Sequence, residues 1–146
     1  MKVSHVAIVG FGNIGRRHLR ILMEIRPEIE VTLVRSGVGE DWPEKKLAKR
    51  TVHSLAAAIR KGIDAAIISS PANFHLSQAS ELAKTGIHLL IEKPLSHTLN
   101  GIGQFLKEVS TKGITILTGY VLRYDPAARK FSQMIQTGLL GKLLHA

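Results

Sequence analysis

Short apolar runs alternate along this chain with longer segments in which the apolar residues recur every three or four positions. A short apolar run is typical of a parallel strand buried on both faces, whereas the longer period is typical of an amphipathic helix. The short runs predict strands at residues 3–9, 30–34, 51–52, 65–68, 87–91 and 114–118. The helical period predicts helices at residues 13–25, 55–61, 74–85, 98–112 and 126–137.

Helix start and stop signals support several of these boundaries. Pro27 follows the first predicted helix, and Ser54 is placed to cap the second one. Gly62 and Gly86 follow the second and third helices, as expected for residues that end a helix. Pro126 fits the first turn of the last helix, where its missing N–H group costs nothing.

Two stretches depart from the alternation. Residues 36–50 are polar and charged, and they predict a loop that holds at most one short helix. Gly101 and Gly103 fall inside the helix expected at residues 98–112 and are expected to interrupt it. Strand and helix otherwise follow one another throughout, which predicts an α/β fold with a doubly wound parallel sheet, the Rossmann fold.

The composition is that of one globular domain. The chain has 146 residues, of which 45% are hydrophobic, so it can bury a sizeable core. No apolar run reaches about eighteen residues, and we expect no membrane partner. The chain has no cysteine, which excludes disulfides and cysteine-ligated zinc. Its first apolar stretch lacks a small-residue cleavage site, so we expect a cytoplasmic protein, and we expect no metal site.

The net charge of +9 raises the question of a nucleic-acid partner. The lysines and arginines are scattered, however, and aromatic residues make up only 5% of the chain, so platforms for stacking bases are scarce. We therefore expect no nucleic-acid partner. Binding of phosphate groups, together with an acidic half that lies outside this chain, explains the positive charge better.

The first predicted turn contains the glycine pattern G-x-G-x-x-G, between a strand and a helix near the amino terminus. In that context the pattern predicts a dinucleotide-binding turn, in which the glycines allow a tight turn, close approach of a pyrophosphate and close helix packing. Amide groups at the start of the following helix would face the anion. The residues expected to contact the dinucleotide here are Gly10, Phe11, Gly12, Asn13, Ile14 and Gly15.

The end of the second predicted strand favours NADP over NAD as the cofactor. NAD-binding folds usually carry an acidic residue about twenty positions beyond the glycines, where it accepts from the ribose 2′-hydroxyl. This chain has Arg35 and Ser36 there, and a guanidinium can hold a 2′-phosphate with two hydrogen bonds. Two alternatives stay open: Arg35 is exposed or stacks on adenine, or Glu40 or Asp41 folds back to the ribose.

Two further motifs follow predicted strands, S-S-P-A-N-F-H at residues 69–75 and I-E-K-P-L at residues 91–95. Residues just beyond the carboxyl ends of parallel strands line the ligand crevice of such a sheet. Together with the glycine turn, these motifs make nearly the whole chain resemble the Gfo/Idh/MocA family of NAD(P)-dependent oxidoreductases. The resemblance implies hydride transfer between the cofactor and a small-molecule substrate, in this family mostly a sugar, an inositol or a related polyol.

The resemblance also implies roles for the E-K-P residues. Lys93 would contact the substrate hydroxyl beside the nicotinamide and assist its proton transfer, as the catalytic residue. Glu92 would contact the cofactor region. The peptide bond before Pro94 is often cis in this family, which would hold Lys93 in place.

The other motif residues match the family less uniformly. Ser69, Ser70 and Pro71 match the segment whose backbone passes under the dinucleotide, whereas Asn73 lies one place later than the asparagine of many members. His75 matches a histidine of the cofactor region, and we favour a structural role for it. Arg123, in G-Y-V-L-R-Y-D-P, would lie near the cofactor or substrate cleft together with Tyr120. A salt bridge at the domain junction is an equally good interpretation of Arg123.

Family members carry a second α/β domain that supplies most of the substrate contacts. We therefore expect a dinucleotide-binding Rossmann domain at residues 1–122, and at residues 123–146 a junction helix and the start of a truncated second domain. Gly138 and Gly141 predict a turn near the end of the chain, with an apolar strand beginning at Lys142.

This reading makes the chain the cofactor half of an oxidoreductase that acts on a CH–OH group of a sugar, sugar nucleotide or polyol. We expect this half alone to be inactive, and the full-length protein to be a homo-oligomer. The alternative is a stand-alone dinucleotide-binding module with a sensing or scaffolding role, although such a module has no need of a lysine at the nicotinamide end.

Overall fold

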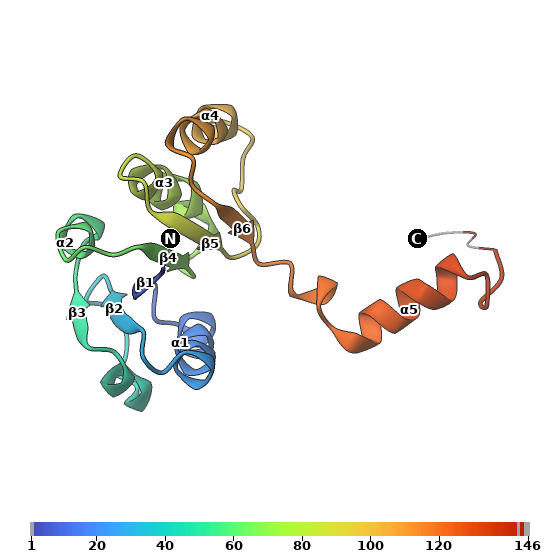
Figure 1. Ribbon diagram of the computed structural model, residues 1–146, viewed down its shortest axis with the longest axis horizontal. Helices are drawn as coiled ribbons and strands as arrows, with labels where there is room; N and C mark the ends of the chain where they lie inside the picture. Colours follow the sequence, from blue (N-terminus) through green and yellow to red (C-terminus); the bar gives the residue numbers. More distant parts are fainter. Residues whose placement is uncertain (1, 143, 145–146) are drawn as a thin grey trace.

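The computed structural model describes residues 2–142 and residue 144. In this part of the chain the core of the fold is a six-stranded sheet whose neighbouring strands all run parallel (Figure 1). The strands are β1 (His5–Val9), β2 (Glu30–Val34), β3 (Arg50–Val52), β4 (Ala65–Ile68), β5 (His88–Ile91) and β6 (Ile116–Thr118). They lie in the order β3-β2-β1-β4-β5-β6, so the chain changes its direction of travel between β3 and β4.

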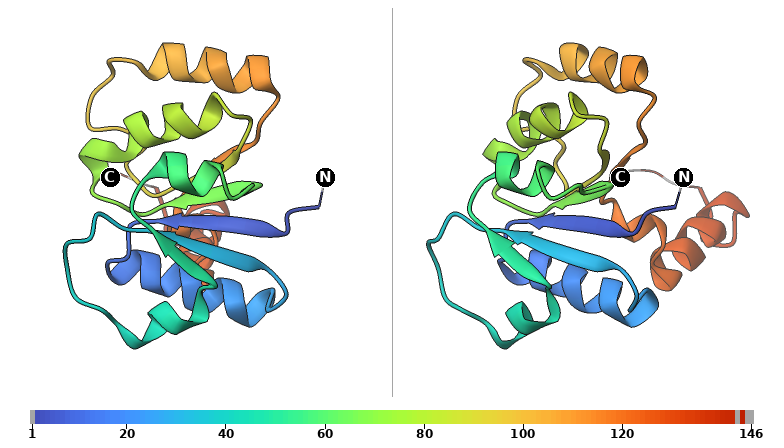
Figure 2. Two further views of the ribbon diagram at one scale, coloured as in Figure 1. Left: turned by 90° about the vertical axis from the view of Figure 1, so that its left-hand side faces the viewer. Right: turned by 60° about the vertical axis from the view of Figure 1, so that its left-hand side comes forward.

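Helices cover both faces of this sheet. The helices of the described residues are α1 (Asn13–Ile25), η1 (Pro43–Leu47, a 3₁₀ helix), α2 (Leu55–Ile59), α3 (Ala72–Ala83), α4 (Ile102–Lys112), η2 (Val121–Arg123, also 3₁₀) and α5 (Pro126–Gln136). Helices α2, α3 and α4 lie on one face, whereas α1 and η1 lie on the other (Figures 1 and 2). This doubly wound arrangement confirms the predicted Rossmann fold.

The central strand β1 is buried along its whole length because it supplies side chains to two hydrophobic layers. Val6 and Ile8 pack with Leu19 of α1 on one face. Ala7 and Val9 point to the opposite face, where the layer includes Phe105 of α4. Successive residues of a strand point to opposite faces, and burial on both sides accounts for the continuous apolar run seen in the sequence.

Element boundaries agree with the sequence prediction for α1, β2 and β4, and differ elsewhere. Helix α4 starts at Ile102 instead of residue 98, because Gly101 has a φ of +84° and a left-handed residue cannot continue a right-handed helix. Helix α3 starts at Ala72, two residues early, with Pro71 in the cap position. Strands β1, β5 and β6 start one or two residues late, β3 starts one residue early, and α2 ends at Ile59 instead of residue 61.

Helix α5 extends away from the sheet, beyond β6 (Figure 1). None of its residues is buried, and the ring of Phe131 is 58% exposed. Asp125 caps the helix by accepting from the backbone N–H of Ala128. Of the apolar strand expected from Lys142 onward, Leu143, His145 and Ala146 lie outside the described residues, and Lys142 itself has no regular structure.

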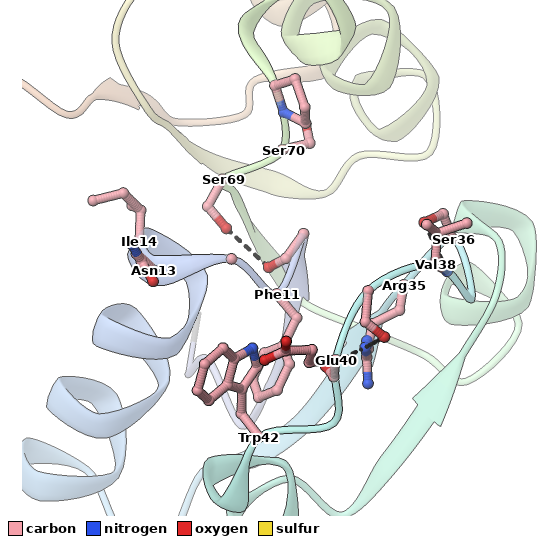
Figure 3. A pocket seen from close by; sticks show the side chains of 14 residues that line it. Phe11, Asn13, Ile14, Arg35, Ser36, Val38, Glu40, Trp42, Ser69 and Ser70 are labelled. Carbon is pink, nitrogen blue, oxygen red and sulfur yellow. Dashed lines mark hydrogen bonds between the residues drawn. The ribbon is translucent and has the colours of Figure 1, made fainter.

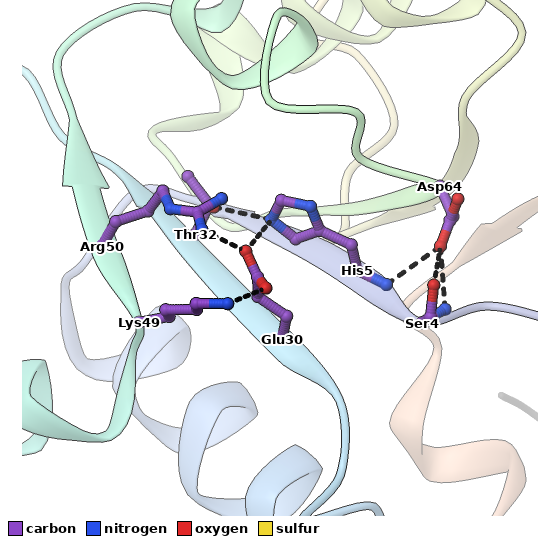
Figure 4. A network of polar contacts seen from close by, with 7 residues as sticks. All are labelled: Ser4, His5, Glu30, Thr32, Lys49, Arg50 and Asp64. Atoms are coloured by element: carbon purple, nitrogen blue, oxygen red, sulfur yellow. Dashed lines mark hydrogen bonds and ion pairs between the residues drawn. The ribbon is translucent and has the colours of Figure 1, made fainter.

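The amino-terminal edge of the sheet is tied together by polar contacts (Figure 4). The carboxylate of Asp64 accepts from the backbone N–H groups of Ser4 and His5 and from the Ser4 hydroxyl. The buried ring of His5 contacts the hydroxyl of Thr32, with 2.7 Å between Nε2 and Oγ1. Glu30 joins the same edge through ion pairs with basic residues at the start of β3. These groups lie at the end of the sheet opposite the glycine turn, so we assign them a structural role.

Among the described residues, no helix is both long and apolar enough to cross a membrane.

Candidate functional site

The candidate residues lie along one edge of the sheet because the segments that carry them follow strands, and five residues directly follow a strand. The backbone N–H groups of these five residues continue the hydrogen bonding of the sheet by one residue beyond each strand. Each donates to the carbonyl of the last residue in a neighbouring strand, at distances of 2.8–3.0 Å. The donors are Gly10, Arg35, Ser69, Glu92 and Gly119. The carboxyl ends of five parallel strands therefore meet at one edge, which is where this fold class binds ligands.

Two of the three glycines are required by close packing at this edge. A Cβ atom on Gly15 would lie 2.1 Å from the carbonyl oxygen of Gly10. A Cβ atom on Gly10 would lie 2.7 Å from the backbone nitrogen of Ser70, and Gly10 also has a φ of +92°. The hydroxyl of Ser69 closes this crossing by donating to the carbonyls of Val9 and Gly10, each 3.1 Å away.

Gly12 differs from the other two because no atom lies within 4 Å of the position that its Cβ would take. It caps helix α1 without a side chain, and the first turn of the helix carries no acidic residue. The first amide groups of a helix have no acceptor within the helix, and they carry partial positive charge. Gly12 therefore leaves open space in front of a helix end that attracts anions.

A cavity of about 520 Å³ lies above this turn (Figure 3). This volume is within the range of small-molecule and cofactor sites. Its lining includes ten residues predicted from the sequence, namely Gly10, Phe11, Gly12, Asn13, Ile14, Arg35, Ser36, Ser69, Ser70 and Pro71. Four further lining residues, Val38, Gly39, Glu40 and Trp42, come from the polar loop after β2. Of these, the sequence raised only Glu40, as an alternative contact for the ribose.

The side chain of Arg35 is only 9% exposed, and the loop after β2 accepts hydrogen bonds from both of its terminal nitrogens. Its guanidinium donates to the carboxylate of Asp41 and to the carbonyls of Gly39 and Glu40, and it lies 5.4 Å from the centre of the Phe11 ring. The sequence alternative of an exposed Arg35 is therefore wrong for this structure. The hydrogen bonds to Asp41, Gly39 and Glu40 hold the positive charge of Arg35 at the wall of the cavity.

Trp42, which lines the cavity, carries the side chain of Arg16 on its ring, a stack that the sequence did not predict. The guanidinium of Arg16 lies over the Trp42 ring, 3.9 Å from its centre, and donates to the side-chain oxygen of Asn13 at 2.6 Å. The Nε atom of Arg16 is buried and lacks a hydrogen-bond partner among the described residues. The signals that the sequence offered for this stack were its one tryptophan, in the loop after the second strand, and the basic residues that follow the glycine turn.

His75 lies beneath the site, not in the wall of the cavity. The ring is 2% exposed. One ring nitrogen lies 2.7 Å from the carbonyl oxygen of Ser70, and the other lies 2.8 Å from that of Pro94. His75 therefore joins the loop after β4 to the loop after β5, in agreement with the structural role favoured from the sequence.

Lys93 lines a second cavity, of about 280 Å³, together with Tyr120 and Arg123 from the segment after β6. The peptide bond between Lys93 and Pro94 is cis, as the resemblance implied. The carboxylate of Glu92 accepts from Nε2 of His18 on α1, at 2.8 Å. Sequence reasoning did not single out His18, although it lies one helical turn beyond the glycine pattern.

The comparisons with known proteins agree with this geometry. Residues 4–120 match the family model described as the GFO_IDH_MocA oxidoreductase family, NAD-binding Rossmann fold. The chain belongs to this family. The match covers the strands β1 to β6, the glycine turn and the motifs at residues 69–75 and 91–95. It confirms the resemblance inferred from the sequence.

Two relatives of the chain carry the names of enzymes that act on an inositol and on a sugar nucleotide. The chain is 27% identical to the myo-inositol 2-dehydrogenase of Thermotoga maritima, over 94% of this chain and 42% of that protein. It is 24% identical to a dTDP-3,4-didehydro-2,6-dideoxy-alpha-D-glucose 3-reductase of Actinomadura kijaniata, over 94% of this chain and 42% of that protein. The chain thus spans about two fifths of the length of these relatives.

A solved structure extends the comparison to the fold. The scyllo-inositol dehydrogenase of Lactobacillus casei, with bound cofactor NAD(H) and scyllo-inositol, superposes with a TM-score of 0.82 at 25% identity. The superposition covers 97% of this chain and 43% of that one. As a Gfo/Idh/MocA oxidoreductase domain, this chain has features that fit a dinucleotide: the open space at Gly12, the positive start of α1 and the buried cation of Arg35.

Proposed function

We propose that this chain is the cofactor-binding half of an NAD(P)-dependent oxidoreductase that acts on a CH–OH group of a sugar, sugar nucleotide or polyol. The observation that carries the proposal is the open space at Gly12, in front of the start of α1, which has no side-chain cap and borders a cavity of about 520 Å³. The inositol and deoxysugar-nucleotide substrates in the names of the relatives support the substrate class.

The residues divide into two groups along the proposed cofactor. The glycine turn and the amide groups of Asn13 and Ile14 would hold the pyrophosphate, while Arg35 and Ser36 would hold the adenosine ribose. The backbone of Ser69, Ser70 and Pro71 would support the dinucleotide from below. When bound, a nicotinamide cofactor supplies the hydride acceptor or donor of the reaction.

Lys93 is the proposed catalytic residue. It lines the second cavity with Tyr120 and Arg123, and a substrate hydroxyl bound in that cavity would lie beside this lysine. Removal of a hydride from a CH–OH carbon requires loss of the hydroxyl proton, and reduction requires its return. Lys93 would hold or deliver that proton at the substrate oxygen. Arg123 would orient the substrate in the same cavity.

NADP is the proposed preferred cofactor, and the charge of Arg35 in the cavity wall supports this choice. A guanidinium donates to a phosphate through two parallel hydrogen bonds, whereas an unphosphorylated ribose presents no anion to it. We also propose that the domain boundary lies near residue 122. The absence of buried residues from α5 supports this boundary.

Titration of the chain with NADPH and with NADH, followed by nicotinamide fluorescence, tests the cofactor site. We expect both nucleotides to bind, with NADPH the tighter. Arg35→Ala should weaken NADPH by about ten-fold or more and change NADH little, because one charge-assisted contact to the phosphate is lost. Equal binding that Arg35→Ala does not change would contradict the NADP preference, and absence of binding by either nucleotide would contradict the cofactor site.

A further inference from the structure

Both terminal nitrogens of the Arg35 guanidinium already donate hydrogen bonds to the loop after β2 in this structure. Asp41 presents its carboxylate to the guanidinium of Arg35, and the carbonyls of Gly39 and Glu40 accept from the same group. A 2′-phosphate that binds both terminal nitrogens of Arg35 needs the N–H group that donates to Asp41. The phosphate and the carboxylate therefore compete for one cation.

We propose that Asp41 is a specificity-determining residue that opposes NADP by competing with the 2′-phosphate for Arg35. The inference rests on the proposed cofactor site and deepens it. Two anions that share one guanidinium repel each other, so the carboxylate has to leave before the phosphate binds with full strength. NAD carries no 2′-phosphate, so Asp41 keeps its place beside Arg35 when NAD binds.

The exposure of the two partners supports an exchange at this position. The side chain of Arg35 is 9% exposed, whereas that of Asp41 is 66% exposed. The cation is therefore held in the cavity wall while the carboxylate can move into solvent. Gly37 and Gly39 on the same loop have φ values of +84° and +99°. Residues with a Cβ atom rarely adopt these backbone conformations, whereas glycine adopts them without steric cost.

A second cation makes the departure of Asp41 less costly. The Nζ atom of Lys45, on η1, lies 2.8 Å from the other carboxylate oxygen of Asp41. Asp41 can thus release Arg35 and keep a charged partner. Lys45 and Arg35, in that order, hold the pKa of Asp41 below its usual range, so the carboxylate is charged at neutral pH.

The test is a set of NADPH and NADH titrations on the full chain with Asp41→Asn, which keeps the shape of the side chain and removes its charge. We expect NADPH affinity to rise by about five-fold, the scale of one exposed ion pair, and NADH affinity to change less than about two-fold. The isolated fragment adenosine 2′,5′-bisphosphate should show the same gain as NADPH, because it carries the 2′-phosphate without nicotinamide.

A double-mutant cycle shows whether Asp41 acts through Arg35. In the Arg35→Ala background, Asp41→Asn should give no gain in NADPH affinity. Glu24→Gln, an exposed change on α1, is the control for the loss of one negative charge. An equal gain with Glu24→Gln, or a gain that persists without Arg35, would show a general charge effect and overturn the proposal.

The remaining outcomes separate this inference from the proposed function. If the wild-type chain binds NADPH and neither Asp41→Asn nor Asp41→Ala binds it more tightly, the competition is refuted and the cofactor site stands. If no variant binds NADPH, NADH or the bisphosphate, both the competition and the cofactor site are refuted.

Discussion

The ring of His18 on helix α1 donates a hydrogen bond to the carboxylate of Glu92, with 2.8 Å between Nε2 and Oε1. The two residues are 74 positions apart in the sequence, and each side chain is mostly buried. Glu92 directly precedes Lys93. The bond therefore links the helix that follows the glycine turn to the segment that carries the proposed catalytic lysine.

Removal of this donor should destabilise the protein. His18→Leu leaves the carboxylate of Glu92 partly buried without its partner, so we expect the free energy of unfolding to fall by about 1–3 kcal/mol in urea titrations. In the double variant His18→Leu/Glu92→Leu the loss should shrink, because no carboxylate is left without a partner. A loss that is the same with and without Glu92 would show that His18 matters only through packing.

His75 gives a second prediction about the loops beneath the site. His75→Leu removes the contacts to the carbonyls of Ser70 and Pro94, which join the loop after β4 to the loop after β5. We expect a stability loss of about 2 kcal/mol and weaker NADPH binding, because both loops border the site. The comparison is Gln78→Leu, which removes a contact to the side chain of Ser70 and leaves the backbone carbonyls paired. Equal nucleotide affinity in wild type and His75→Leu would contradict this role.

Substitutions at two glycines of the turn should affect different properties, one the stability of the fold and the other the binding of the nucleotide. Gly15→Ala should cost about 3 kcal/mol in urea unfolding, because its methyl group would lie 2.1 Å from the carbonyl oxygen of Gly10 and force the strand and helix apart. Gly12→Ala should leave stability nearly unchanged, since nothing lies near its methyl group and its φ of −77° suits alanine. The same change should weaken NADPH binding, because the methyl group fills the space proposed for the pyrophosphate. Unchanged NADPH binding by Gly12→Ala would place the pyrophosphate elsewhere.

Asp64 gives a prediction about acid stability. Hydrogen bonds from the backbone of Ser4 and of His5, and then from the Ser4 hydroxyl, hold the pKa of Asp64 below its usual value of 3.8 (Figure 4). A carboxyl group with a lowered folded-state pKa stabilises the protein above the unfolded-state value. That contribution fades as the pH falls below 3.8 and is gone once the pH is below the folded-state pKa.

The measurement is urea unfolding of the wild type and of Asp64→Asn at pH 7 and at pH values below 4. We expect Asp64→Asn to be less stable at pH 7, and the difference between the two proteins to shrink as the acid protonates Asp64. Glu24→Gln, which removes an exposed charge elsewhere, is the control. A difference that does not change with pH would show that the carboxylate charge contributes nothing at this position.

Local sequence signals determined much of this fold. The bounds of α1, β2 and β4 could be predicted because short apolar runs, helical periodicity and Pro27 act on the backbone where they occur. The glycine turn could be predicted for the same reason, since it depends on consecutive residues. The predicted start of helix α4 was wrong because a glycine such as Gly101 can lie inside a helix or, in the left-handed conformation, just before one.

The sequence also placed most candidate residues at one edge, because residues that follow parallel strands must meet there. Their partners were decided only by the tertiary structure. The sequence raised Asp41 as a possible contact for the ribose, but the packing of the loop places its carboxylate on Arg35. Likewise, only the tertiary structure brings His18 of α1 to Glu92, the residue after β5. Backbone patterns are local and repeat along the chain, whereas each side-chain pair depends on the register and spacing of elements far apart in sequence.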